Sequence, residues 1–281
     1  MEEVKKSSER LEILKKIDEL EKEGKFDVDP EIDPPTVPLK PGEVDFLRKK
    51  LSSKIKAKFA DKVSFAYFNN LIKKGVIVID GYEGLEYLKN LKSGAIVTAN
   101  HFNPFDSIPI HKVFKKYQRK RQLYKIIREG NYNFPGLFGF FMKHCYTLPL
   151  SDNFKVMKEC MHAVDTLLQE GKLILVYAEQ SLWWNYRKPK PLKEGAFRFA
   201  AKNNVPILPT FTTMRDTDKL DENGFPIQAY TLHILEPIYP DSNLSLKENV
   251  QMLKNKNEEV WKELYEKVYG IPLTYLTKEI K

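Results

Sequence analysis

The chain has 281 residues, of which 42% are hydrophobic and 12% aromatic, so it can bury a large core and is neither disordered nor collagen-like. Its 46 Lys and Arg exceed its 38 Asp and Glu, and the net charge of +8 favours anionic partners. Two cysteines cannot form a disulfide framework, which indicates a reducing compartment. Because the N-terminus is highly charged and no uncharged apolar run approaches ~20 residues, we expect neither a secretory signal nor a membrane span.

Residues 1–42 and 43–74 precede the main domain. The first segment starts as a charged helix with apolar residues at helical spacing, and then runs through five prolines (26–42), which predict an extended linker. The second is a basic amphipathic segment in which apolar residues recur every four positions: Leu47, Leu51, Ile55, Phe59 and Val63. Two interpretations remain open for it, an ordinary helix packed on the core and a helix that lies on a membrane surface.

Residues 75–281 alternate between short β-branched runs and longer helical stretches. The expected strands are 76–79, 95–98, 173–177, 205–211 and 230–235. The expected helices are 107–122, 153–170, 192–203 and 245–269, the last of which opens with a capping-box sequence. This alternation predicts an α/β domain whose sheet is covered by helices on both faces, behind a helical N-terminal extension.

A polar cluster follows the strand at 95–98, and it contains His101 and Asp106. In open α/β sheets, ligands bind beyond the carboxyl ends of the strands. A carboxylate five residues after a histidine, across a strand-to-helix turn, can orient the imidazole for proton transfer. The same pair could also be a structural hydrogen bond, and these two residues alone do not separate the two interpretations.

The segment NHFNPFDS (100–107) resembles the NHx4D signature of the glycerolipid acyltransferase superfamily. This superfamily includes the lysophosphatidic acid (1-acylglycerol-3-phosphate) acyltransferases. Four further pieces resemble that family in the family's order: VIVIDGYEGL, YKIIREGNYNFPGLFGFFMKHCYTLPLSD, LILVYAEQSLWW and KEGAFRFAAKNNVPILPTF. Together they cover roughly residues 75–215. The resemblance implies an α/β fold with a central mixed sheet covered by helices.

The resemblance also implies a reaction. An acyltransferase of this family moves a fatty acyl group from a thioester, carried by coenzyme A or acyl carrier protein, to a hydroxyl of a lysolipid. His101 would be the general base and Asp106 its orienting carboxylate. No cofactor or metal is expected, and the chain has no G-x-S-x-G motif for a covalent serine route.

Two of these pieces depart from the family at positions that bind the acceptor's phosphate in its members. They are YKIIREGNYNFPGLFGFFMKHCYTLPLSD, the second motif, and LILVYAEQSLWW, the third motif. Glu179 is retained, but Ser181 and its neighbours differ, and the second block ends without its usual arginine. We expect Glu179 to bind acceptor hydroxyls or to organise the turn, and Ser181 to contact the acceptor. Arg187 and Lys193 are candidate substitute cations, with a solvated basic loop as the alternative, and Arg128 could meet a phosphate of the donor or the acceptor. The departures predict a weaker dependence on an acceptor phosphate than is usual in the family.

Three other patterns carry weaker signals. His144, Cys145, Cys160 and His162 are poorly spaced for zinc, because the members of each pair point apart. Trp183 and Trp184 could line a groove or belong to the core. The basic stretch 112–128 has no recognised nucleic-acid motif beside it, so we expect it to meet lipid headgroups or donor phosphates instead.

The sequence as a whole predicts a peripheral-membrane acyltransferase, cytoplasmic and attached to the inner face of the membrane. Its attachment would use the basic helix at 44–73 and the apolar stretch 134–142. The alternative is a catalytically inert lipid-binding or scaffold protein on the same fold.

Overall fold

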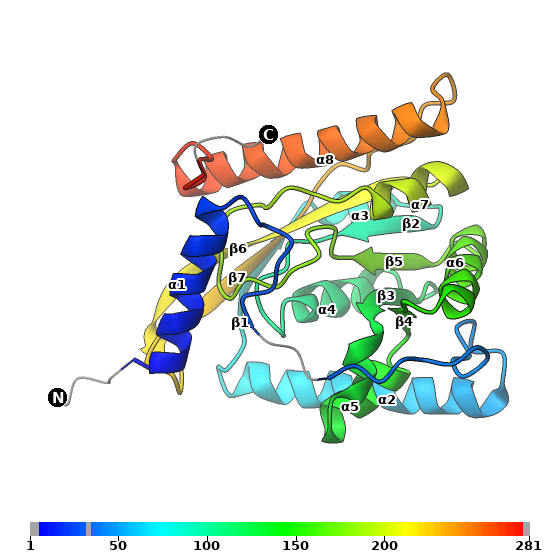
Figure 1. The fold of residues 1–281 in the computed structure, drawn as a ribbon, viewed down its shortest axis with the longest axis horizontal. Helices are drawn as coiled ribbons and strands as arrows, with labels where there is room; N and C mark the ends of the chain where they lie inside the picture. Colours follow the sequence, from blue (N-terminus) through cyan, green and yellow to red (C-terminus); the bar gives the residue numbers. More distant parts are fainter. Residues whose placement is uncertain (1–5, 32–34, 278–281) are drawn as a thin grey trace.

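The computed structural model describes residues 6–31 and 35–277, and its elements alternate between strands and helices after an N-terminal helical part (Figure 1). Their order is α1 (Ser8–Lys22), α2 (Leu51–Lys73), β1 (Val78–Glu83), α3 (Leu85–Asn90), β2 (Ala95–Thr98), α4 (Ser107–Tyr117), β3 (Leu123–Arg128), the 3₁₀ helix η1 (Glu129–Asn133), α5 (Gly136–His144), β4 (Thr147–Leu150), α6 (Phe154–Gln169), β5 (Leu173–Val176), α7 (Gly195–Asn203), β6 (Ile207–Leu220), β7 (Pro226–Ile234) and α8 (Leu246–Tyr269).

One seven-stranded sheet runs through the molecule in the order β1-β7-β6-β2-β5-β3-β4. Strands β6, β2, β5, β3 and β4 are mutually parallel, whereas β7 is antiparallel to β6 and parallel to β1. The sheet is therefore mixed, as predicted. The carboxyl ends of β2, β5 and β3 lie side by side at one edge, where a strand-to-helix turn can present polar groups.

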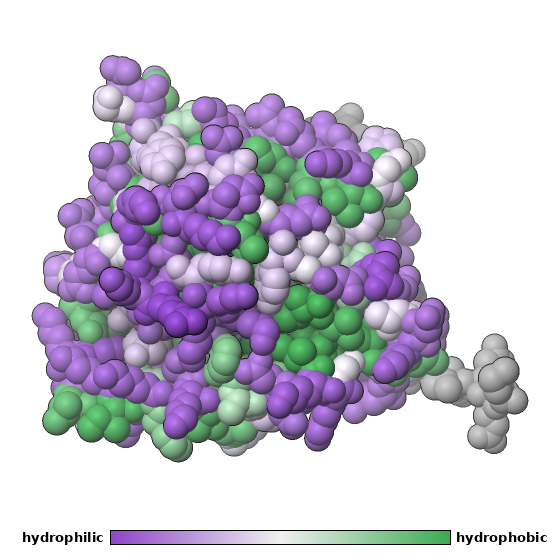
Figure 2. All heavy atoms as spheres, turned by 180° about the vertical axis from the view of Figure 1, so that it is seen from behind, coloured by the Kyte–Doolittle hydropathy of each residue, from purple (hydrophilic) through white to green (hydrophobic). Residues whose placement is uncertain are grey.

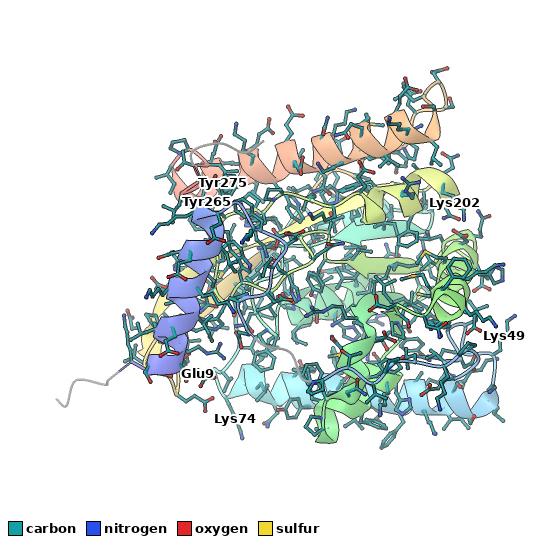
Figure 3. All side chains as sticks on the ribbon, viewed as in Figure 1. Glu9, Lys49, Lys74, Lys202, Tyr265 and Tyr275 are labelled. Atoms are coloured by element: carbon teal, nitrogen blue, oxygen red, sulfur yellow. The ribbon has the colours of Figure 1, made fainter. Side chains whose placement is uncertain are left out.

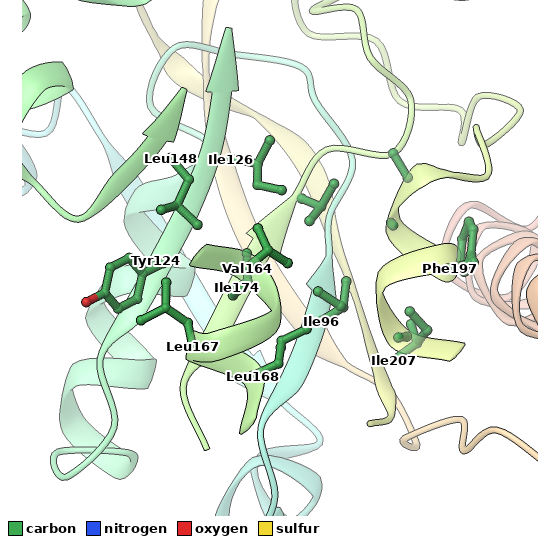
Figure 4. Close-up of a cluster of buried hydrophobic side chains, with 14 of the residues drawn as sticks. Ile96, Tyr124, Ile126, Leu148, Val164, Leu167, Leu168, Ile174, Phe197 and Ile207 are labelled. Carbon is green, nitrogen blue, oxygen red and sulfur yellow. The ribbon is translucent and has the colours of Figure 1, made fainter. Parts of the chain in front are cut away.

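Alternate residues of the central strands face two different hydrophobic clusters. Ile96 and Ile174 join a cluster with α6, α7 and α8, part of which Figure 4 shows around Val164 and Phe197. Their strand neighbours, such as Val97, point to the opposite face and pack with α3 and α4. Burial on both faces explains why these strands read as continuous apolar runs.

The N-terminal extension packs against the domain. Ile13 and Ile17 of α1 are buried with Trp183, Trp184 and Phe225, so both tryptophans belong to a hydrophobic cluster. Further along the chain, Leu39 and Phe46 insert their side chains into the main core. The proline-rich segment between these anchors is thus tied down at both of its described ends.

Helix α2 departs from an ordinary core-packed helix. The residues that it buries are small ones, Ala57, Ala60 and Ser64. The stripe of Leu51, Ile55 and Phe59 instead faces solvent, with exposed fractions of 73%, 60% and 60%. Within the described residues, no helix has both the length and the apolar character that a bilayer span requires.

The sequence pattern does not predict two of the strands and two of the helices. Strand β3 is not predicted because Lys125 and Arg128 interrupt its apolar run. Strand β4 is not predicted because Pro149 lies within it. Proline is tolerated there because β4 is an edge strand of the sheet. Helices α3 and α5 are short, and β6 continues to Leu220 in a long hairpin with β7. The other predicted elements are present, but some ends differ: α2 begins at Leu51 where a helix from residue 44 was expected, and α4 ends at Tyr117 where residue 122 was expected.

Candidate active site

His101 lies directly beyond β2 and is joined to Asp106. Its Nδ1 is 2.6 Å from Oδ2 of Asp106, while the imidazole keeps 24% of its surface exposed and the carboxylate is buried. The turn between them is local: Asn103 Oδ1 accepts from the Phe105 amide at 2.9 Å, and the Asp106 amide donates to the carbonyl of Asn103 at 3.0 Å. Asp106 then precedes α4 as its N-cap residue.

Three further donors hold the carboxylate of Asp106. Its Oδ2 accepts from the backbone amides of Phe102 at 3.1 Å and Asn103 at 3.4 Å, and its Oδ1 accepts from the Tyr177 hydroxyl. Because Asp106 accepts from Nδ1 of His101, that nitrogen carries the proton and Nε2 is left with a lone pair. This is the tautomer that a general base needs at Nε2.

Tyr177 and Lys125 belong to the site, although the sequence does not predict them. The Tyr177 ring stacks on the His101 imidazole, with centroids 4.0 Å apart and planes 19° apart. Burial raises the pKa of the Tyr177 phenol well above its ordinary value, so it stays a donor. Lys125 donates to Ser107 Oγ at 2.7 Å, and burial lowers the pKa of its ammonium. The sequence signal is only positional, because Tyr177 is the first residue after β5, the neighbour of β2.

Glu179 is buried and organises the loop after β5. One of its oxygens accepts from the His101 amide and the other from the Lys190 amide, both at 2.9 Å. The Lys190 ammonium lies 3.6 Å away. Burial lowers the pKa of Lys190 to about 8 and raises the pKa of Glu179, although their mutual attraction opposes both shifts. Both oxygens are therefore engaged within the protein, which agrees with the second of the two expected roles of this side chain, organising the turn.

Ser181 is likewise fully buried, and its hydroxyl is engaged on both sides. Its Oγ donates to the Phe26 carbonyl at 2.6 Å and accepts from Lys190 Nζ at 2.6 Å. A hydroxyl with two internal partners and no exposed surface is not available to a substrate in this conformation. The structure thus gives Ser181 a structural role in the loop, contrary to the expectation of acceptor contact.

The three expected cations all have acidic partners. Arg128 pairs with Asp29 at 2.9 Å and Lys193 with Asp27 at 2.7 Å. Arg187 pairs with Asp216 at 2.7 Å on the β6–β7 hairpin, so it is set apart from the other two. Arg128 ends β3, and the Lys193 amide donates to the carbonyl of Ala178 in the loop after β5 at 2.8 Å.

The geometry supplies an oriented, partly exposed imidazole at the carboxyl edge of the sheet. Such an imidazole can take a proton from a hydroxyl and return it to a leaving group. In the described part of the chain, no group of three or more His, Cys, Asp or Glu side chains is arranged to hold a metal ion.

Comparisons with known proteins agree with this chemistry. The family model described as Acyltransferase matches residues 81–213, which include His101, Asp106, Tyr177 and Glu179. The fold is similar to the crystal structure of the 1-acyl-sn-glycerophosphate (LPA) acyltransferase PlsC from Thermotoga maritima, with a TM-score of 0.52 and 21% identity over 79% of this chain and 81% of that chain. A search of curated proteins finds no match. Residues 81–213 are thus similar to the acyltransferase family, and the fold of the chain is similar to that of an acyltransferase.

Proposed function

We propose that this enzyme transfers a fatty acyl group from an acyl thioester to a hydroxyl of a lysolipid or a related lipid acceptor, with His101 as the general base. The single observation that carries the proposal is the 2.6 Å contact between His101 Nδ1 and Asp106, placed at the sheet edge of a domain similar to the acyltransferase family. The donor is the thioester of coenzyme A or of acyl carrier protein.

The reaction follows from the free Nε2 of His101. Nε2 takes the proton of the acceptor hydroxyl as its oxygen attacks the thioester carbonyl, and Asp106 stabilises the imidazolium that forms. The tetrahedral intermediate then collapses, the carbon–sulfur bond breaks, and the thiolate receives the proton from the imidazolium. An ester and a free thiol result, with no covalent bond to the enzyme.

The test is substitution at the pair. His101→Ala should lower kcat by about 10²–10⁴-fold, since that is the usual contribution of a general base. Asp106→Asn should cause a loss of at least about 100-fold, because the amide no longer selects the productive tautomer. His162→Ala, on the exposed side of α6, is the matched control and should retain full activity. Near-normal turnover by His101→Ala would refute the mechanism.

An inert lipid-binding protein on this fold is the alternative function. The test is a screen of labelled acyl-CoA and acyl carrier protein against several acceptors, read by mass spectrometry. Formation of an acylated product that depends on His101 supports the enzyme. Lipid binding without any product, for every pair of donor and acceptor, would favour the alternative.

We also propose that the enzyme docks on the cytoplasmic face of an anionic membrane. The docking surface is the α2–α5 apolar patch, formed by Leu51, Ile55 and Phe59 of α2 with Leu137 of α5, all exposed. The rings of Phe59 and Phe140 pack edge to face, with their centroids 6.2 Å apart. This contact joins α2 to α5, which lie side by side in Figure 1. Lysines lie around it, including Lys49 and Lys74 at opposite ends of α2 (Figure 3).

An apolar patch bordered by lysines fits the interface of an anionic bilayer. Each basic residue near such a surface contributes ~1 kcal/mol, and each apolar side chain that leaves water adds roughly 1.5–3 kcal/mol. Leu51→Ser/Ile55→Ser/Phe59→Ser should therefore abolish sedimentation with phosphatidylserine vesicles, and high salt should weaken it. Leu246→Ser, on α8 and also exposed, is the control. If the full chain does not sediment even at low salt, the docking proposal is wrong.

A basic groove of about 720 Å³ lies between α2 and α4, and it is the place we assign to phosphates of the donor or of lipid headgroups. Its lining combines Phe65 and Phe114 with cations of the 112–121 stretch. From behind, the molecule presents a largely hydrophilic face with separate hydrophobic patches (Figure 2). Saturable, salt-dependent binding of coenzyme A or of anionic vesicles supports this assignment, whereas tighter binding of random-sequence DNA would contradict it.

A further inference from the structure

A short stretch of the N-terminal extension lies along the loop that follows β5. We call this stretch, residues 26–29, the acidic strap. Its contacts join residues about 150 positions apart in the sequence: the Phe26 carbonyl with Ser181 Oγ at 2.6 Å, the Val28 carbonyl with Trp183 Nε1 at 2.9 Å, and Asp29 Oδ1 with the Leu182 amide at 2.6 Å. The loop itself reaches the histidine, because the Trp183 amide donates to the His101 carbonyl at 3.2 Å.

Both carboxylates of the strap bind cations at the catalytic edge. Asp29 Oδ2 lies 2.9 Å from Arg128 Nη2, and Asp27 Oδ2 lies 2.7 Å from Lys193 Nζ. Lys193 lowers the pKa of Asp27 by this hydrogen bond. Arg128 ends β3, and the Lys193 amide donates to the carbonyl of Ala178 at 2.8 Å, so both cations lie beside the end of β5.

The donors around Asp29 form an anion position. Its two oxygens receive a backbone N–H and a guanidinium, which is the set of donors that also binds a phosphate oxygen. The Arg128 side chain is 56% exposed and Lys193 is 47% exposed, whereas Asp29 is only 17% exposed. Both cations are therefore partly exposed to solvent, and the more deeply placed Asp29 carboxylate lies between the Leu182 amide and Arg128.

We propose that Asp27 and Asp29 determine acceptor specificity by acting as resident anions. They offset positive charge of Arg128 and Lys193, and they would repel a phosphate beside the loop that contacts His101. The acceptor that fits is then a neutral lysolipid, such as a monoacylglycerol or a glycolipid, and not a lysophosphatidic acid. This inference rests on the proposed acyl transfer, because it names the acceptor class of that same site.

A binding experiment tests the strap independently of turnover. Glycerol 3-phosphate is titrated into the full chain and into Asp27→Asn/Asp29→Asn, in which the side-chain amide oxygen introduced at position 29 can still accept from the backbone amide of Leu182. We expect at least tenfold tighter binding by the double variant, and loss of that gain when Lys193→Gln is added, because Asp27 pairs with Lys193 in the full chain. Glu31→Gln is the matched control, because Glu31 lies in the same segment but pairs with Arg10 of α1.

The acyl-transfer arm measures kcat/KM for lysophosphatidic acid and for monoacylglycerol. The ratio of the first to the second should rise at least tenfold in the double variant. If neither acceptor is used by the full chain, the proposed function fails, and the titration still decides the role of the strap. Unchanged affinity for glycerol 3-phosphate in the double variant would overturn the inference. If circular dichroism shows that the double variant is unfolded, the single variant Asp27→Asn replaces it, because Asp27 is about half-exposed. The single variant should bind glycerol 3-phosphate about threefold more tightly than the full chain.

Discussion

Glu179→Gln probes the buried pair that holds the loop after β5 against His101. The carboxylate accepts two backbone amides at 2.9 Å and lies 3.6 Å from the Lys190 ammonium, and both side chains are almost completely buried. Glutamine has nearly the same shape, but only its oxygen accepts. Its NH₂ group therefore faces one of the two amides, and Lys190 loses its counter-charge.

The size of the effect follows from these contacts. A lost hydrogen bond to a charged acceptor costs about 1.5–3 kcal/mol. In the parent protein Glu179 is the counter-charge of the buried Lys190 ammonium, and the attraction between them opposes the lowering of the Lys190 pKa by burial. Without Glu179 the pKa of Lys190 is lowered further, because the charged ammonium is left buried without this partner. The free energy of unfolding should fall by about 3–5 kcal/mol at pH 7, the range for breaking a buried ion pair.

The pH dependence gives a second signature. The folded-state pKa of Lys190 lies below its ordinary 10.5, so in the parent protein this residue makes the free energy of unfolding rise with pH between about 8 and 10.5. At pH 9, Lys190 is largely neutral in both proteins. The difference in free energy of unfolding between parent and variant should then be smaller than at pH 7, because the part of it that comes from the charged ammonium is largely absent.

The assay is urea unfolding followed by tryptophan fluorescence at pH 7 and pH 9, together with the KM for the acceptor. Glu194→Gln, at an exposed i,i+4 pair with Arg198, is the control and should change the free energy of unfolding by less than about 0.5 kcal/mol. A loss below about 1 kcal/mol combined with a strongly raised acceptor KM would refute the reasoning, since it would show that Glu179 binds substrate.

Three further predictions concern Tyr177, the two cysteines and the N-terminal cap of α8. Tyr177→Phe keeps the ring on His101 but removes a donor to Asp106, so kcat should fall about tenfold with little change in KM. Burial raises the pKa of Cys145 to about 11 and of Cys160 to about 12, so Ellman's reagent at pH 8 should react with both slowly until urea unfolds the chain; fast native reaction would contradict this. Ser245→Ala removes the α8 capping box and should cost about 1 kcal/mol in thermal unfolding.

The sequence by itself determined the features that depend on nearby residues. Strand β2 reads directly from its apolar run, and α8 from its capping box and helical period. The joining of His101 and Asp106 was predictable as well, because five residues of a strand-to-helix turn keep the two groups within reach. The order of the five family-like pieces predicted the α/β fold from the sequence alone.

Only the tertiary structure decided which distant residues meet at the catalytic edge. Tyr177 and Lys125 reach Asp106 and Ser107 because β5 lies beside β2 and β3 lies on the other side of β5, and strand order cannot be read from periodicity. The outward apolar stripe of α2 also needed the structure, since the helical spacing of its residues is the same whether that face meets core or solvent.

The roles of the charged residues were the hardest to predict from the sequence. Glu179 and Lys193 are equally polar in the sequence, but the fold buries the first beneath His101 and leaves the second half-exposed beside Asp27. The cost of burying a charge, and the partner that offsets it, depend on what surrounds the group after folding. For the same reason, the pairing of the acidic strap with Arg128 and Lys193 came only from the tertiary structure, because it joins segments about 100 to 165 residues apart.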